Sequence, residues 1–128
     1  MTEPYFAYGY NKHHLAKRIN RDIHPLPAIL YDHDVVFKVR SKFNNKSFAT
    51  IVYCPGSVVK GNLYFIHPEE ILFLDHLEDV ELGTYQRIVK PVFCKNRLIE
   101  AWMYQCTDPY WLTDTLEPTQ EYFFDTLL

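Results

Sequence analysis

The chain of 128 residues has 48% hydrophobic and 23% charged residues and a formal net charge of −3. This composition excludes wholesale disorder, and the weak negative charge argues against a protein that binds nucleic acid through its overall field. The length predicts one domain over residues 1–128, because two domains would each have an undersized core.

The chain opens with the strand-like run "YFAYGYN" at Tyr5–Asn11. Apolar and aromatic residues here favour a buried strand, and Gly9 predicts a sharp turn because glycine adopts backbone angles that other residues avoid. The turn is either the end of a strand or a small loop that binds an anion or a carbonyl group. A short helix is expected next, over Lys12–Asn20, and its basic residues are interpreted as a solvated face.

The later segments alternate between strand and helix patterns. In chain order we expect one or two strands in Ala28–Val39, two strands in Ser47–Ile66 joined by a turn at Pro55-Gly56-Ser57, and a helix from Pro68 in which Ile71, Leu74 and Leu77 recur three apart. We then expect strands at Thr84–Val92 and Arg97–Cys106 joined by the "CKNR" turn, and a final helix beginning near Pro118. Strands outnumber helices, which predicts an α+β domain on a mixed or antiparallel sheet that could close into a barrel.

Glu78 is the carboxylate that the sequence singles out for proton transfer. It follows the largely apolar run "ILFLDHL", and an apolar setting raises the pKa of a carboxyl group toward neutrality. Asp75 and Asp79 would raise that pKa further as like charges. The competing interpretation is an exposed acid at a helix end, which is the commoner case.

The histidines and cysteines do not predict a metal site or a disulfide framework. Cys54, Cys94 and Cys106 are widely spaced and odd in number, and the histidines have no second ligand cluster at a recognised spacing. No stretch reaches the roughly 20 apolar residues that cross a bilayer, and the N-terminus lacks a signal-peptide layout. We therefore expect a cytoplasmic protein without membrane contact, metal or cofactor.

Five motifs in order resemble the γ-glutamylcyclotransferase-like (AIG2-like) family. They are "YFAYGYN" for the family's F-x-Y-G-S-N opening, the Ser47–Ile66 segment with its Pro-Gly and Val-x-Gly, "LDHLEDVELGTYQR" with Glu78 seven places before Tyr85, "AWMY" ending at Tyr104, and "EPTQEY" ending at Tyr122. Each motif is weak alone. Together they cover nearly the whole chain.

The resemblance implies a mixed β-barrel flanked by short helices, with a cavity at the opening loop. In active members, the α-amine of a γ-glutamyl group attacks its own γ-carbonyl, which yields 5-oxoproline and releases the attached amine. By resemblance, Glu78 is the catalytic acid and base, and the substrate-binding residues are Tyr8, Gly9, Tyr10, Asn11, Tyr85 and Tyr104. A small γ-glutamyl compound is then the expected partner, and no cofactor is needed.

Two departures from the family pattern keep a second function open. Tyr10 stands where the family commonly has serine, and Asp79 places a second negative charge beside Glu78. The first hypothesis is a cyclotransferase. The second is an inactive module on the same fold that binds a small ligand or regulates another protein, and a purely structural subunit is a third. Tyr8, Tyr85 and Tyr104 could also be core aromatics, and Asn11 could simply cap the helix.

Overall fold

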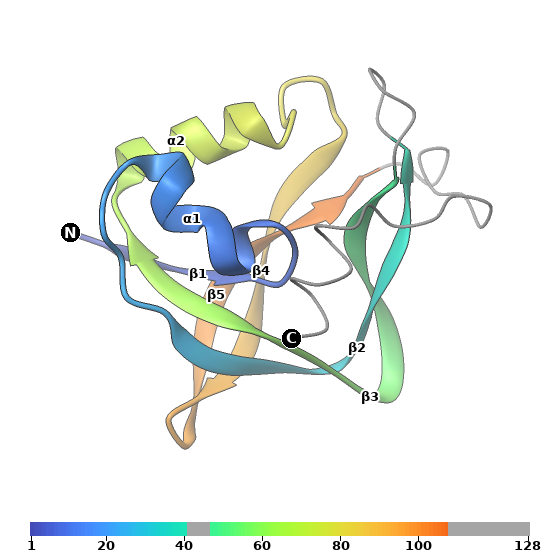
Figure 1. Ribbon diagram of the computed structural model, residues 1–128. Helices are drawn as coiled ribbons and strands as arrows, with labels where there is room; N and C mark the ends of the chain where they lie inside the picture. Colours follow the sequence, from blue (N-terminus) through green and yellow to red (C-terminus); the bar gives the residue numbers. More distant parts are fainter. Residues whose placement is uncertain (41–46, 108–128) are drawn as a thin grey trace.

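The computed structural model describes residues 1–40 and 47–107. These ranges form β1 (Glu3–Ala7), α1 (Asn11–Ile19), β2 (Leu26–Arg40), β3 (Ser47–Ile66), α2 (Pro68–Leu77), β4 (Tyr85–Cys94) and β5 (Arg97–Cys106). The strands close into a barrel in the order β1-β3-β2-β4-β5 (Figure 1). The predicted final helix near Pro118 lies outside the described residues.

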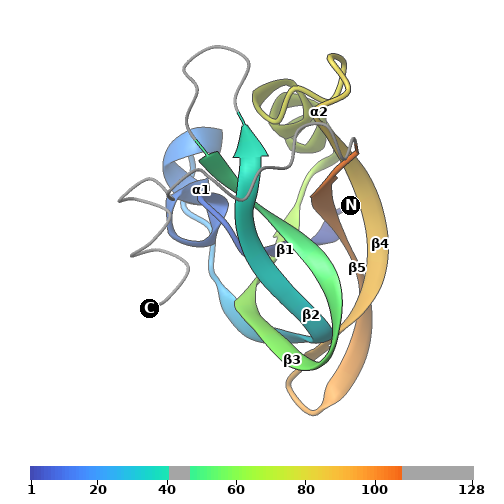
Figure 2. The same ribbon diagram turned by 90° about the vertical axis from the view of Figure 1, so that its right-hand side faces the viewer.

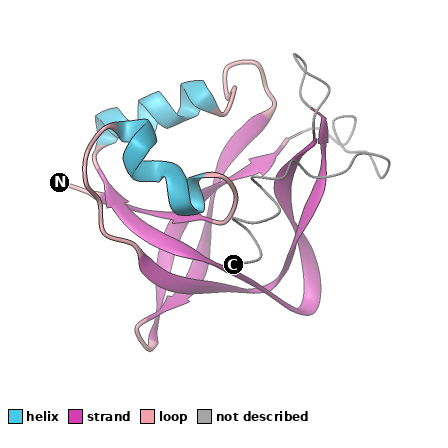
Figure 3. Ribbon diagram, viewed as in Figure 1, coloured by secondary structure: helices cyan, strands magenta, loops and turns pink. Residues whose placement is uncertain are grey.

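The barrel is mixed, as the sequence predicts. β1 runs parallel to β5, with Tyr5 paired to Trp102, and the other neighbouring strands run antiparallel. Both described helices lie outside the sheet, as the colouring by secondary structure makes clear (Figure 3). The α+β class with a mixed β-barrel and flanking helices is therefore confirmed.

Alternation along the strands divides the buried residues into two layers. Successive side chains of a strand point to opposite faces, so Phe6 of β1 and Met103 of β5 join a cluster to which all five strands contribute, inside the barrel. Tyr5 and Trp102 point to the other face and pack with Leu15 of α1 and Leu74 of α2. The two helices therefore cover the aromatic outer face of β1 and β5, on the same side of the barrel (Figures 1 and 2).

The predicted hairpin turn at Pro55-Gly56-Ser57 is wrong, because β3 is one continuous strand. The pairing of β2 with β3 shifts register between Tyr31 and His33, so several residues of β3 stand opposite Asp32 alone. Gly56 has φ +86°, Asp32 has φ 60°, and the Gly56 N–H donates to Asp32 Oδ1 at 3.0 Å. The Pro-Gly signal thus marks a bulge, which bends both strands around the barrel (Figure 2).

The other elements predicted within residues 1–40 and 47–107 are confirmed, with small shifts of their ends. His67 caps α2 through a capping box with Glu70, and Pro68 occupies the first turn, which fixes where this helix begins. Lys95 and Asn96, both with positive φ, form the two-residue turn between β4 and β5. Neither α1 nor α2 is long and apolar enough to cross a membrane.

Candidate functional site

A pocket opens where the end of β1 turns into α1 and meets the end of α2. It encloses about 310 Å³ of space, part of it open to solvent. The residues around it come from five parts of the chain: Tyr5, Tyr8, Gly9, Tyr10, Asn11, Ala49, Glu78, Tyr85 and Tyr104. All seven residues singled out from the sequence thus border one pocket, and Tyr5 and Ala49 join them.

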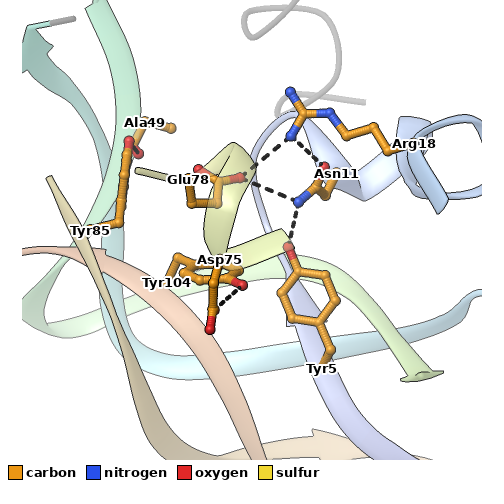
Figure 4. A network of polar contacts seen from close by, with 8 residues as sticks. All are labelled: Tyr5, Asn11, Arg18, Ala49, Asp75, Glu78, Tyr85 and Tyr104. Atoms are coloured by element: carbon orange, nitrogen blue, oxygen red, sulfur yellow. Dashed lines mark hydrogen bonds and ion pairs between the residues drawn. The ribbon is translucent and has the colours of Figure 1, made fainter. Parts of the chain in front are cut away.

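Glu78 ends α2 and projects into this pocket (Figure 4). Its backbone N–H closes the last helical turn on Leu74 at 2.9 Å, so the carboxylate is anchored at a fixed point of the fold. Its side chain is only 16% exposed. The interpretation of Glu78 as an ordinary exposed acid is therefore wrong.

The pKa of Glu78 is raised from 4.5 to about 7, chiefly by burial and to a smaller extent by the neighbouring Asp79 carboxylate. The Arg18 guanidinium and the Asn11 amide act in the opposite direction. Asp75, also expected to raise this pKa, instead accepts a hydrogen bond from the Tyr104 hydroxyl at 2.8 Å and forms an ion pair with Arg87, whose Nε lies 3.1 Å from Asp75 Oδ1. A carboxyl group with a pKa near 7 can both take up and release a proton at neutral pH.

Asn11 connects the first helix to this carboxylate. Its Nδ2 donates to the Tyr5 hydroxyl at 2.7 Å and to Glu78 Oε1 at 3.4 Å (Figure 4). Its Oδ1 accepts from Arg18 Nη1 at 3.1 Å. Asn11 is buried and its side chain does not cap α1, so the capping alternative is wrong.

Three tyrosines of the pocket direct their hydroxyl groups to protein acceptors. Tyr8 donates to the backbone carbonyl of Tyr104, Tyr85 donates to that of Ala49 at 2.6 Å, and Tyr104 donates to Asp75. All three side chains are buried, as the interpretation as core aromatics expected, and all three also line the pocket. Burial also raises the pKa of Tyr104 far above its usual value, so this phenol stays protonated.

The turn at Gly9 and Tyr10 differs from its prediction. The described glycines with positive φ are Gly56 and Gly83, so the turn into α1 does not rest on unusual backbone angles at Gly9. The Gly9 carbonyl accepts the Lys12 N–H at 3.0 Å. The Tyr10 ring stacks on His14 at 4.3 Å, and the Arg18 guanidinium carbon lies 4.4 Å from the centre of the same ring.

Arg18 is the main residue of the site that the sequence analysis missed. Its Nη1 lies 3.5 Å from Glu78 Oε1, and its side chain is 28% exposed. Arg18 follows Asn11 by seven residues, two helical turns, so both project from one face of α1. This spacing was the available signal, but the basic run was interpreted as a solvated face. Tyr5 was treated only as strand packing.

Within residues 1–40 and 47–107, no three histidine, cysteine, aspartate or glutamate side chains come together in a way that could hold a metal ion. The site is instead a buried carboxylate with one amide and one guanidinium beside it, surrounded by phenol rings. These groups can handle protons and bind charged or polar parts of a small organic molecule.

The five-stranded mixed barrel with two outer helices is the γ-glutamylcyclotransferase-like fold. The sequence matches the profile described as "Gamma-glutamyl cyclotransferase, AIG2-like" over residues 5–123, and the chain belongs to this family. No curated protein matches the sequence.

Solved structures with the same fold include a protein titled "Gamma-glutamyl cyclotransferase", which is 25% identical with a TM-score of 0.74. An uncharacterised human protein is 26% identical, also with a TM-score of 0.74. Each alignment covers 84% of this chain and 68% of the other. YkqA from Bacillus subtilis is 20% identical with a TM-score of 0.79, and the alignment covers 98% of this chain and 46% of YkqA.

Proposed function

We propose that the protein is a γ-glutamylcyclotransferase in which Glu78 is the general acid and base. The observation that carries this proposal is the buried Glu78 carboxyl group, with a pKa of about 7, on the wall of a pocket that also contains the Tyr8–Asn11 turn. Membership of the family and the likeness to a solved protein titled as such an enzyme support it.

The proposed reaction needs one proton carrier and no nucleophile from the protein. The Glu78 carboxylate takes a proton from the substrate's α-ammonium group, and the freed amine attacks the γ-carbonyl carbon to form the ring of 5-oxoproline. The bond from that carbon to the departing nitrogen then breaks as Glu78 returns the proton to that nitrogen. The ring nitrogen still carries one proton too many, and Glu78 passes this second proton to the released amine, which leaves as an ammonium ion. Holding the substrate folded supplies much of the rate, because the attack is intramolecular.

The turn from Tyr8 to Asn11 suits the oxygen that becomes negative during this attack. α1 begins at Asn11, on the pocket wall, so the positive end of its helix dipole lies at the pocket. The Lys12 N–H already donates to the Gly9 carbonyl, and the dipole favours an anion beside the other N–H groups of the first turn. Either the developing oxyanion or the substrate carboxylate would gain from this position.

The experiment is a mass-spectrometric search for 5-oxoproline. Purified protein would be incubated with γ-glutamyl dipeptides, glutathione, γ-glutamyl amines and ε-(γ-glutamyl)-lysine, beside the Glu78→Gln variant. We expect product from the parent protein and at least a roughly hundred-fold lower rate from the variant, which has no proton to exchange. Glu81→Gln is the matched control, because Glu81 is an exposed acid three residues further on, and it should keep the parental rate.

Product formed equally fast by Glu78→Gln would remove Glu78 from the mechanism. A folded parent protein that forms no 5-oxoproline from any substrate would support the second candidate, a module that binds a ligand without turnover. Tyr10 favours that candidate, since a bulky ring packed against His14 and Arg18 stands where the family commonly has serine.

A further inference from the structure

Arg18 lies beside the pocket, in contact with two residues that line it, and the proposed reaction does not yet use it. Its guanidinium contacts Glu78 and Asn11 and lies against Tyr10, so it reaches the proposed proton carrier from the opposite helix (Figure 4). Both polar contacts use Nη1. Among the described residues, Nη2 and Nε have no protein partner, so that edge of the guanidinium can still donate to a ligand.

The charges on the two helices form a pair that a zwitterion would match. The Glu78 carboxylate at the end of α2 can bind a positively charged group. Arg18 is a permanent cation, and its Nη1 lies 3.5 Å from Glu78 Oε1. The head group of a γ-glutamyl compound carries an ammonium and a carboxylate on the same carbon. When the ammonium binds Glu78, Arg18 loses its partner, and the adjacent carboxylate can take that place.

We propose that Arg18 binds the α-carboxylate of the γ-glutamyl group and selects substrates that carry this charge. This inference rests on the proposed function. A guanidinium presents two parallel N–H donors to a carboxylate, which a lysine at the same position does not. The N–H groups at the start of α1 are then left for the oxyanion.

Arg18 also offsets the negative charge that Asp79 adds beside Glu78. Glu78 and Asp79 would together repel a substrate carboxylate, and Arg18 supplies the opposite charge from α1. Its side chain is 28% exposed and is therefore not locked in the core, so it can release Glu78 when a substrate ammonium takes its place. In the structure the same residue pairs with Glu78.

The test compares a γ-glutamyl amine with the same compound whose α-carboxylate is converted to a primary amide. We expect the parent protein to prefer the acid. Arg18→Gln should lower kcat/KM for the acid by about 10- to 100-fold, as expected for a lost charged hydrogen bond, and should change the amide little. Arg18→Lys should fall between. Lys17→Gln removes the same charge from the exposed neighbouring position and should behave as the parent.

An equal loss on the acid and the amide would overturn the inference, because Arg18 would then act only by supporting Glu78 or the fold. If the parent forms no product, binding of 5-oxoproline and of its amide, measured by calorimetry, separates the two proposals. Preference for 5-oxoproline that Arg18→Gln abolishes would uphold the carboxylate site while the enzyme proposal fails. No such preference, or one that Arg18→Gln leaves intact, would overturn the carboxylate site.

Discussion

Glu78 lies between charges of both signs that come from two helices. Asp79 beside it disfavours ionisation, and Arg18 and Asn11 of α1 favour it, but burial outweighs both and raises the pKa of Glu78 to about 7. A carboxyl group that holds its proton more tightly in the folded chain than in the unfolded chain makes stability depend on pH. The proposed catalytic group therefore reduces stability in the pH range where it ionises.

The sign of this effect can be measured with Glu78→Gln. The pKa of Glu78 is about 7 when folded and takes the ordinary value of 4.5 when unfolded, so its contribution to stability is complete below pH 4.5 and is lost as pH rises through 7. The loss should reach roughly 3 kcal/mol. Urea unfolding between pH 4.5 and 8 should show the variant gaining stability over the parent as pH rises. A difference that stays constant across this range would contradict the raised pKa.

At the residue scale, the sequence patterns predicted which residues line the pocket better than they predicted which charged groups act on Glu78. Glu78 could be predicted because an apolar run precedes it and because its spacing to Tyr85 resembles a family motif. Arg18 could not, because its importance depends on Asn11 facing a carboxylate 67 residues away in the chain. The angles at Gly9 were predicted wrongly, since Tyr10 already has helical φ and ψ of −54° and −42° and the turn needs nothing unusual.

Among the elements, β3 shows a local turn signal that gave a wrong prediction because a contact with another strand determines the backbone there. Pro55, Gly56 and Ser57 are typical of a hairpin turn, but the strand continues because Asp32 of β2 bends at the same level and accepts the Gly56 N–H. No local pattern distinguishes such a bulge from a turn. α2 was predictable because Pro68 and the Glu70 capping contact act within the helix itself.

Gly61 of β3 provides a test at this scale. A Cβ atom there would lie 2.5 Å from the Ala7 carbonyl oxygen and 2.7 Å from the Phe6 ring, so Gly61→Ala must push β1 away. We expect a loss of about 1–3 kcal/mol in the free energy of unfolding, with reduced ligand binding because β1 leads into the pocket loop. Chemical denaturation measures this free energy, with Lys60→Ala at the exposed neighbouring position as the control. Unchanged stability would mean that β1 and β3 pack less closely than described.

For the whole molecule, the geometry of the site depends on how α1 and α2 sit on the barrel. Asn11 and Arg18 belong to α1, and Glu78 ends α2. Outside the apolar contacts between the helices, Arg21, just after α1, donates to both carboxylate oxygens of Glu70 in α2. The distances are 2.5 Å from Nε and 2.8 Å from Nη2. This ion pair joins the segment after α1 to the first turn of α2.

Arg21→Gln should therefore loosen the two helices relative to one another. We expect a loss of about 1 kcal/mol in the free energy of unfolding at pH 7, since the pair is partly exposed. Arg21 lowers the pKa of Glu70, so this stabilisation is present above the ordinary carboxyl pKa and disappears as the solution is acidified through the folded value. Thermal unfolding at pH 7 and near pH 3, with Lys17→Gln as control, measures it. An equal loss at both pH values would argue against the ion pair.

The parallel pairing of Tyr5 with Trp102 has a consequence for how the protein is made. On the ribosome, β1 emerges first but must wait for β5 before the barrel can close. The pocket likewise unites Tyr5 with Tyr104. Contacts between such distant parts of a chain slow folding, because a long loop must be ordered before they form. A nascent chain released before β5 would thus carry Glu78 without the enclosure that raises its pKa, so proton-transfer chemistry is expected only from the finished barrel.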